Sequence, residues 1–433
     1  MSKPCSWNRI PDVTPKAAYH LMHRLDPIPE ELPRPLTVYG NGRSYSDVGL
    51  TKEGSLLLTR DMNRLIEFDG YQGIIRCDAG ITLAQLLEFI VPKGWFLPVT
   101  PGTRFATVGG CLANDVHGKN HHALGSFGHH VRAFELCRSD GSHRVCRPDD
   151  QEPWFAATIG GLGLTGLIRW VELQLISIEN PWMWVASHRF DDLEAFWAMN
   201  ASLESDWPYT VAWIDCLAKG QAQGRGIYLA GRHAGPQSDL PRYRSRNWEM
   251  PFDPPLSLVN SLSLKAFNQL YYKQKVCPSG KLVHHAPYFY PLDAIGQWNR
   301  IYGKKGFYQY QCVIPPHNAQ AATSELLSTI AKRKQGSFLA VLKTFGEKPS
   351  LGLLSFPRPG TTLALDFPNK GQATLDLLAD LDAIVLDAGG ALYPAKDARM
   401  PAAMFRASFS DWEAFTPFID PAFSSHFWQR VSL

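Results

Sequence analysis

Short strand-like and helix-like segments alternate along residues 35–175. Residues 73–80 and 95–99 have the apolar character of short strands. Between them, apolar residues recur at helical spacing after Thr82, a residue type suited to cap a helix N-terminus, and predict a helix through about Val91. The apolar face of this helix would carry Leu83, Leu86, Leu87 and Ile90.

A hairpin and a further strand follow this helix. Residues 131–136 and 144–146 flank the dipeptide Asp140-Gly141, which is a strong signal for a hairpin turn. Residues 167–176 alternate apolar and polar side chains and predict another strand. Strands and helices mixed in this way predict the α+β fold class.

The composition changes after Asn180-Pro181. Residues 181–390 are rich in Trp, Tyr and Phe, and we interpret them as a second domain that follows a first domain of residues 1–180. A chain of 433 residues is long enough for two domains. The stretch from Gly235 to about His285 is long for a connection, and such stretches are usually lids or unstructured segments.

Charge and cysteine content exclude several classes of protein. The 43 basic and 40 acidic side chains leave a net charge of +3 and form no basic run, so we expect no nucleic-acid partner. The 8 cysteines contain no C-x-x-C pair, which is typical of reduced thiols. The first residues lack the apolar core of a signal peptide, and no apolar run reaches the ~18 residues of a membrane span. We therefore expect a cytoplasmic protein.

Two loops of the first domain are rich in small and polar residues. One covers Gly40–Asp47, and the other runs from Pro98 to His122. Glycine lets the backbone approach a ligand closely, and the amide N–H groups of such loops bind anions such as a pyrophosphate. The two loops therefore predict a phosphate-bearing cofactor that is held from two sides.

The segment Gly161–Gly166 matches the dinucleotide-binding pattern G-x-G-x-x-G. That pattern requires a strand before it and a helix after it. Here residues 154–158 favour a helix and residues 167–171 favour a strand, so the order is reversed. We interpret the segment as a Gly-rich turn that lets backbone lie against a ligand or another strand.

Several patches resemble the flavoprotein oxidases of the vanillyl-alcohol-oxidase type, and among them the family that oxidises polyprenylphosphoryl ribose. The resemblance covers nearly the whole chain and is weakest between residues 185 and 285. It is carried by Gly42-Arg43-Ser44-Tyr45, Pro101-Gly102-Thr103-Arg104, Asp115–His122, Gly306–Gln311, Leu354–Pro357 and Ala395-Lys396-Asp397.

The resemblance implies an FAD-binding domain of the PCMH type, a substrate domain built on an antiparallel sheet with helices, and a return of residues 391–433 to the FAD domain. Backbone N–H groups of residues 40–47 and 107–110 would surround the pyrophosphate. Many relatives carry a histidine that is bonded to the flavin where this chain has Arg43, so we expect non-covalent FAD. The implied FAD contacts are Gly40, Asn41, Gly42, Arg43, Ser44, Tyr45, Ser46, Asp47, Gly102, Thr107, Val108, Gly109, Gly110, Asn114, His117, Ile168 and Tyr393.

The reaction that the resemblance implies is oxidation of the 2′-hydroxyl of a polyprenylphosphoryl-β-D-ribose to the 2-keto sugar, by hydride transfer to flavin N5. A partner short-chain reductase would then complete an epimerisation to the arabinose form. Lys396 matches the family's active-site lysine and would stabilise the substrate oxygen or accept its proton. The substrate side of the flavin would be lined by Tyr45, Gln311, Lys343 and His117.

One departure from the family and two alternative functions bear on this expectation. Mycobacterial members carry a cysteine two residues before an Asp-Phe-Pro segment, whereas this chain has Ala364 before Asp366-Phe367-Pro368, so its chemistry needs no thiol there. The alternatives are a soluble alditol- or aldonolactone-type oxidase of the same fold and a catalytically inactive flavin-binding scaffold.

Two further clusters were weighed for function. The spacing of His117, His121, His122, His129 and His130 fits no closed metal site, so we expect no metal. Residues 241–281 mix Lys and Arg with aromatic residues. This mixture suits a peripheral contact with the inner face of a membrane, and it suits a solvated loop equally well.

Overall fold

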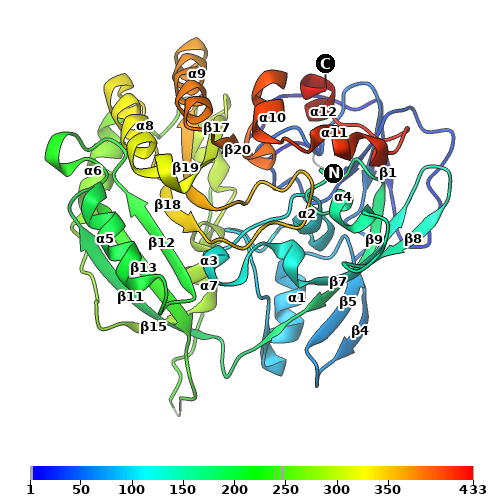
Figure 1. Ribbon diagram of the computed structural model, residues 1–433, viewed down its shortest axis with the longest axis horizontal. Coiled ribbons are helices and arrows are strands. Elements are labelled where there is room, and N and C mark those ends of the chain that lie inside the picture. The colour runs from blue at the N-terminus through cyan, green and yellow to red at the C-terminus, as the bar shows by residue number, and fades with distance from the viewer. Residues whose placement is uncertain (1–2, 238, 245–247, 433) are drawn as a thin grey trace.

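A large antiparallel sheet lies beside two smaller sheets in the computed structural model, which describes residues 3–237, 239–244 and 248–432 (Figure 1). The smaller sheets belong to the first 180 residues, and helices lie on one face of the large sheet. The α+β class predicted from the sequence is confirmed.

The N-terminal unit, residues 3–178, contains the two smaller sheets. The first is parallel, in the order β1 (Ala17–His20), β3 (Ser55–Leu58), β2 (Leu36–Tyr39). The second is antiparallel, in the order β4 (Leu65–Asp69), β5 (Ile74–Asp78), β9 (Leu167–Gln174), β7 (Val131–Cys137), β8 (His143–Cys146). A short pair, β6 (Trp95–Phe96) and β10 (Ile176–Ser177), completes its strands.

The helices of the N-terminal unit follow the apolar pattern of the sequence. Helix α1 (Leu83–Ile90) starts at Thr82, whose side chain accepts a hydrogen bond from the Gln85 amide in a capping box. Its buried face is the predicted one: Leu83, Leu86, Leu87 and Ile90. The other helices are α2 (Val108–Ala113), α3 (His121–Leu124) and α4 (Trp154–Thr158). Because α4 precedes residues 161–166 and β9 follows them, the structure has the reversed order that argued against a dinucleotide-binding motif.

The large sheet has eight antiparallel strands. Its order is β15 (Lys281–His284), β11 (Trp182–Phe190), β13 (Gly226–His233), β12 (Tyr209–Ile214), β18 (Ala340–Phe345), β19 (Gly360–Pro368), β17 (Phe307–Ile314), β20 (Ala391–Leu392). One face packs against α5 (Leu193–Leu203), α8 (Ala319–Arg333) and α9 (Gln372–Asp387). Its opposite face borders the N-terminal unit and carries polar side chains that successive strands present in alternation.

The stretch from Gly235 to His285 is more ordered than the sequence indicated. It contains helix α6 (Ser261–Tyr272) and strand β15, and it continues into α7 (His285–Phe289). Asn260 caps α6 by accepting hydrogen bonds from two amides of the first turn, and Phe267 and Tyr271 pack against Trp213 of β12. The expectation of a long unstructured loop was therefore wrong for residues 261–272 and 281–284, because a capping signal and a two-residue aromatic contact were overlooked. Residues 238 and 245–247 lie outside the described residues.

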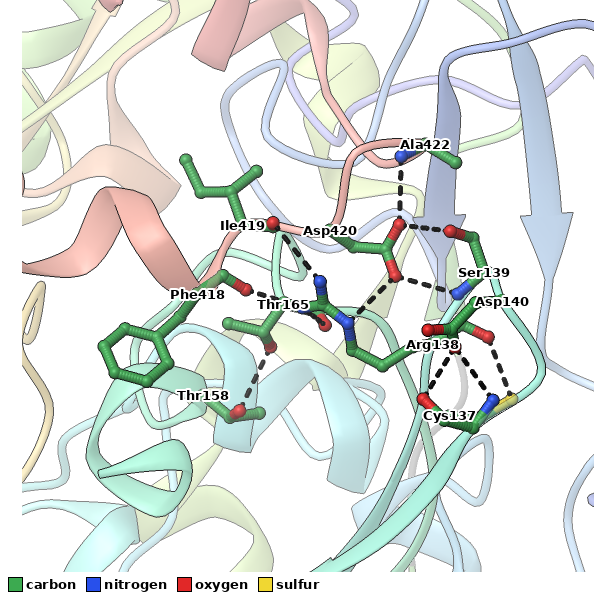
Figure 2. Close-up of polar contacts among 11 residues, drawn as sticks. Cys137, Arg138, Ser139, Asp140, Thr158, Thr165, Phe418, Ile419, Asp420 and Ala422 are labelled. Carbon is green, nitrogen blue, oxygen red and sulfur yellow. Dashed lines mark hydrogen bonds and ion pairs between the residues drawn. The ribbon is translucent and has the colours of Figure 1, made fainter. Parts of the chain in front are cut away.

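The C-terminal segment returns to the N-terminal unit through a fully buried carboxylate, Asp420 (Figure 2). Asp420 accepts hydrogen bonds from the amide and hydroxyl of Ser139, at 2.8 and 2.6 Å, and its Oδ2 lies 3.4 Å from Arg138 Nε. Arg138 also donates to the carbonyl oxygen of Phe418 at 2.8 Å. The segment between α11 (Trp412–Phe415) and α12 (His426–Val431) is thereby bound to the β7–β8 hairpin. Helix α10 (Ala402–Ser408) precedes α11.

Replacing Asp420 with alanine should destabilise the protein by about 1–3 kcal/mol, because the amide and hydroxyl of Ser139 would lose their acceptor and Arg138 would lose its ion pair. Thermal and urea unfolding of the full chain would measure this loss. Asp140→Ala is the matched control, since Asp140 lies in the same hairpin but is exposed and bonds only to Ser142; its loss should stay below about 1 kcal/mol. Equal effects of the two substitutions would contradict the role given to Asp420.

Candidate active site

A cavity of about 560 Å³ lies between the N-terminal unit and the polar face of the large sheet. The loop after β2, the loop after β6 and helix α2 form one wall, and strands β17, β18 and β19 form the other. Of the residues predicted to contact cofactor or substrate, the cavity brings together Gly40, Asn41, Gly42, Arg43, Ser44, Tyr45, Ser46, Gly102, Thr107, Gly109, Gly110, Asn114, His117, Ile168, Gln311, Lys343, Tyr393 and Lys396.

Two predicted cofactor contacts, Asp47 and Val108, do not line the cavity. The Asp47 carboxylate is fully buried and faces α12, where it accepts from Arg430 Nη2 at 2.6 Å and pairs with His426 Nδ1 at 2.5 Å. Val108 is fully buried in the core of the N-terminal unit, and its amide donates to Ile81. Both residues are adjacent to lining residues in sequence, but the backbone turns their side chains toward structural partners.

The second loop was also expected to offer its amides to a pyrophosphate, and the structure corrects this. The amide of Gly109 donates to the carbonyl oxygen of Ala79 at 2.8 Å, and that of Gly110 donates to Thr107 Oγ1 at 3.2 Å. These amides therefore close the start of α2. What the glycines supply is close approach: a Cβ on Gly40 of the first loop would lie 2.6 Å from Thr107 Oγ1.

The first loop does offer free donors. Within the described chain, the amides of residues 41–44 donate to no protein acceptor. Gly42 reverses the chain there with a φ of +59°, and a Cβ on it would lie 2.2 Å from Tyr39 Oη. Asn41 Nδ2 donates to the carbonyl oxygen of Phe105 at 2.7 Å, which joins the two loops. Consecutive amides around a left-handed glycine form a cradle for an anion, so this donor set fits the pyrophosphate of FAD.

The opposite wall is built by strand register. Gln309 and Gln311 lie on one face of β17, opposite Asp366 and Ala364 of β19. On the other edge of β19, strand β18 places Lys343 opposite Thr362 and Val341 opposite Ala364. Lys343 is only 7% exposed, so it belongs to the cavity wall and not to a solvated strand face.

His117 lies at the centre of a hydrogen-bonded chain. Its Nδ1 lies 2.9 Å from Lys343 Nζ, and its Nε2 lies 2.9 Å from Gln311 Nε2, which also donates to Thr362 Oγ1 at 3.1 Å. Burial and the Lys343 charge lower the pKa of His117 well below its usual value, and burial lowers the pKa of Lys343. A neutral imidazole has one donor and one acceptor nitrogen. One ring nitrogen of His117 therefore donates and the other accepts, which joins Lys343, His117 and Gln311 in one hydrogen-bonded chain.

Lys396 also lines the cavity, from the C-terminal part of the chain. It follows Tyr393 in the turn Pro394–Lys396, and its Nζ lies 4.0 Å from the centre of the Tyr45 ring. The Tyr45 amide donates to the carbonyl oxygen of Ala395 at 2.9 Å, so the first loop and this turn are held together. Burial lowers the pKa of Lys396, and the charge of Asp366 opposes this shift.

Asp366 is a site residue that the sequence did not reveal. It is fully buried behind the cavity wall, where its Oδ1 accepts from Gln309 Nε2 at 2.6 Å. Burial raises the pKa of its carboxyl group, and the Gln309 hydrogen bond and the Lys396 charge oppose that rise. Only the pairing of β17 with β19 brings it there, and register is not legible from an isolated strand sequence.

Asp115, the first residue of the patch Asp115–His122, holds the loop before His117 in place. It has a φ of +39° and is fully buried. Its carboxylate accepts from the Gly128 amide at 2.9 Å and from Ser355 Oγ at 2.6 Å. Tyr393 Oη donates to the carbonyl oxygen of Asn114 at 2.9 Å beside it. Both contacts tie the N-terminal unit to the chain that follows β18.

Of the remaining histidines of the cluster, three have hydrogen-bond partners, whereas the buried His121 packs against the Phe345 ring and its ring nitrogens make no hydrogen bond among the described residues. The Nε2 atoms of His122, His129 and His130 each lie 3.0 Å from a backbone carbonyl oxygen. In the part of the chain that the structure describes, no group of three His, Cys, Asp or Glu side chains is placed to hold a metal ion.

Comparison with known proteins agrees with the donor set of this cavity. Residues 28–147 match the FAD binding domain family. The chain is 33% identical to decaprenylphosphoryl-β-D-ribose oxidase of Mycolicibacterium smegmatis over 93% of its own length and 90% of the relative. It is 29% identical to human Δ(24)-sterol reductase, but over only 30% of its length and 25% of that relative. The protein is an FAD-dependent oxidoreductase, and it belongs to the decaprenylphosphoryl-β-D-ribose oxidase family.

Proposed function

We propose that this protein oxidises the 2′-hydroxyl of a polyprenylphosphoryl-β-D-ribose to the 2-keto sugar. The name of the Mycolicibacterium relative supports the substrate class. The observation that carries the proposal is the convergence of Lys396, Tyr45, Gln311 and the His117–Lys343 pair on the cavity that the amide cradle of residues 41–44 also borders. We further propose that residues 1–180 and 391–433 form the FAD domain and residues 181–390 the substrate domain.

The side chains of this wall divide the chemical work between them. When bound, FAD supplies the two-electron acceptor for the carbon that is oxidised. Lys396 takes the proton of the substrate hydroxyl when its own amine is neutral, which burial makes accessible. Gln311 can accept a hydrogen bond from a neighbouring hydroxyl group through its Oε1, and its bond to His117 fixes its orientation. Asp366, acting through its charge, sets how readily Lys396 becomes neutral.

The substrate class is tested by adding a farnesylphosphoryl-β-D-ribose to the purified protein without oxygen and recording flavin absorbance. Bleaching of the oxidised band by this compound, but not by an aldonolactone, is expected. Bleaching by the lactone alone would assign the protein to the soluble-sugar oxidases. Bleaching by neither compound would leave a flavin-binding protein without this activity and would overturn the proposal.

The rate of this bleaching should depend on pH through Lys396. Burial lowers the pKa of Lys396 from its usual 10.5, and only the neutral amine accepts a proton, so the rate should fall as the pH drops through the lowered pKa. Lys396→Met should slow flavin reduction by about 10²–10⁴-fold and remove this dependence. Stopped-flow absorbance across a pH series measures both effects.

Asp366→Asn tests whether the Asp366 carboxylate sets the pH dependence of flavin reduction. The negative charge of Asp366 raises the pKa of Lys396, so its removal should move the falling limb to lower pH. Asp380→Asn is the control, since Asp380 pairs with Arg333 on the surface of α9 and should leave the limb in place. A limb that stays unchanged in Asp366→Asn would show that this carboxylate does not act on the proton acceptor.

We propose that residues 248–275 contact the membrane surface from which a lipid-linked sugar would be drawn. Trp248, Phe252, Leu256 and Leu262 are each more than 60% exposed, and α6 carries Lys265 about one turn after Leu262. Trp248 belongs to the short strand β14 (Trp248–Glu249), which pairs with β16 (Ile295–Gly296) at the cavity wall. Exposed apolar side chains with nearby cations suit an anionic bilayer. Among the described residues, no helix is long and apolar enough to cross one.

Sedimentation with anionic phosphatidylglycerol vesicles tests this contact. The double variant Leu256→Asp, Leu262→Asp should bind at least about 10-fold more weakly than the unmodified protein, because burial of two leucines in the bilayer interface is lost. Leu25→Asp replaces a leucine that is 67% exposed on the N-terminal unit and should bind normally. Equal binding by all three proteins would contradict the proposed surface.

The product would pass to a second enzyme. A 2-keto sugar regains a hydroxyl of the opposite configuration only by reduction at the same carbon. We therefore propose a reductase of the short-chain type as the partner that completes the epimerisation.

A further inference from the structure

Arg43 is a charged side chain that has no hydrogen-bond or ion-pair partner among the residues that the structure describes. Its guanidinium lines the cavity, and within the described residues it makes no hydrogen bond and no ion pair. Its Nε atom is buried. A guanidinium keeps its charge in proteins, so five N–H donors in a cavity wall need an acceptor that the protein itself does not provide.

Two aromatic rings hold the Arg43 guanidinium in place. Its central carbon lies 4.2 Å from the centre of the Trp7 ring and 5.3 Å from that of Phe105. Trp7 is itself fixed, because its amide donates to the carbonyl oxygen of Ser44 at 2.8 Å and its carbonyl oxygen accepts from Asn299 Nδ2 at 2.8 Å. Rings above the guanidinium leave its edge, where the N–H groups lie, as the surface for a ligand.

Asp293 is the acidic residue whose charge acts most strongly on Arg43, but it forms no ion pair with the guanidinium. Asp293 interacts with Arg43 only at longer range than an ion pair. Its carboxylate accepts from the amide of Arg104 at 2.8 Å, and burial raises the pKa of its carboxyl group. A buried cation that lacks a close counter-charge is costly, and an anionic ligand removes that cost.

Arg43 and Lys396, the proposed proton acceptor, line the same cavity. Trp7 contacts Trp298 at 5.9 Å between ring centres, Trp298 contacts Tyr45 at 6.4 Å, and Lys396 Nζ lies 4.0 Å from the Tyr45 ring. Arg43 and Lys396 therefore border one cavity and are linked through this row of aromatic rings. In a ribosyl phosphate, the carbon that carries the phosphate is bonded directly to the carbon that carries the 2′-hydroxyl. A substrate that places this hydroxyl at Lys396 therefore carries its phosphate within the same cavity that Arg43 lines.

We propose that the Arg43 guanidinium binds the phosphate of the polyprenylphosphoryl-ribose substrate, an inference that rests on the proposed function. A fork of parallel N–H groups matches two phosphate oxygens, which a lysine cannot do. The pyrophosphate of FAD is the other phosphate source in this cavity. The free amides of residues 41–44 already suit that group, which favours the substrate as the partner of the side chain.

Arg43→Gln and Arg43→Lys test this inference in the FAD-loaded protein. With farnesylphosphoryl-β-D-ribose, the KM for flavin reduction should rise about 10- to 100-fold in Arg43→Gln, with kcat within about twofold, because one charge-assisted contact is lost. Arg43→Lys should recover part of that loss. The KM for methyl β-D-ribofuranoside, which has no phosphate, should rise much less than the KM for the farnesyl compound, so the ratio of the two KM values is the readout, and flavin content is measured alongside. Arg144→Gln is the control, since Arg144 stacks on Trp154 away from the cavity.

Each other outcome overturns the inference in a distinct way. Loss of flavin in Arg43→Gln would assign the guanidinium to the cofactor phosphate. An equal rise in KM for both sugars would assign it to packing of the cavity wall, and an unchanged KM would leave it no role in binding. If the unmodified protein is not reduced by the farnesyl compound, the proposed function itself has failed, and the flavin content of the variants still reports which phosphate Arg43 contacts.

Discussion

Four basic side chains, Arg43, Lys119, Lys343 and Lys396, are buried or half-buried around one cavity, and the cost of burying them governs how its walls are built. None of the four forms an ion pair with a carboxylate in the described chain. Aromatic faces and neutral partners take that place: Lys119 Nζ lies 5.4 Å from the Tyr288 ring, and Lys343 bonds to His117. Such partners lower the cost of burial without cancelling the charge, so the cavity stays ready for anions and for proton transfer.

Carboxylates are used differently, and the contrast explains the connectivity of the fold. Asp47, Asp115 and Asp420 are all fully buried, and each accepts hydrogen bonds from a segment distant in sequence. Asp47 and Asp420 fasten the C-terminal segment to the N-terminal unit, and Asp115 fastens the loop before His117 to Ser355. A buried carboxylate with several donors is costly to break, so these three residues hold the loops in register around the cavity. These three carboxylates thus stabilise the connections between segments, whereas the four basic side chains line the cavity.

The extent to which the sequence predicted this arrangement follows from the range of each interaction. Helix α1 and the reversed order around Gly161–Gly166 were predicted correctly, because a cap and a local pattern determine them. The placement of Asp47 was not, because its partner Arg430 is 383 residues away. Asp366 was noticed only as part of a sequence marker, because its function depends on the pairing of β19 with β17. Local signals reach along a few residues, whereas the site is assembled by sheet register and by the returning C-terminus.

Ala364 shows what this division means for variation in the cavity. It occupies the centre of the polar wall, opposite Gln311 on one side and Val341 on the other. Its methyl group makes no hydrogen bond, and the bonds around it run from Gln311 to Thr362 and His117 and from Gln309 to Asp366. Ala364 takes no part in the hydrogen bonds of Gln309 and Gln311. A substitution at position 364 would therefore change the volume of the cavity and leave these bonds intact. The side chain at position 364 therefore takes no part in this hydrogen-bonded chain, whereas Gln309 and Gln311 are each committed to a buried partner.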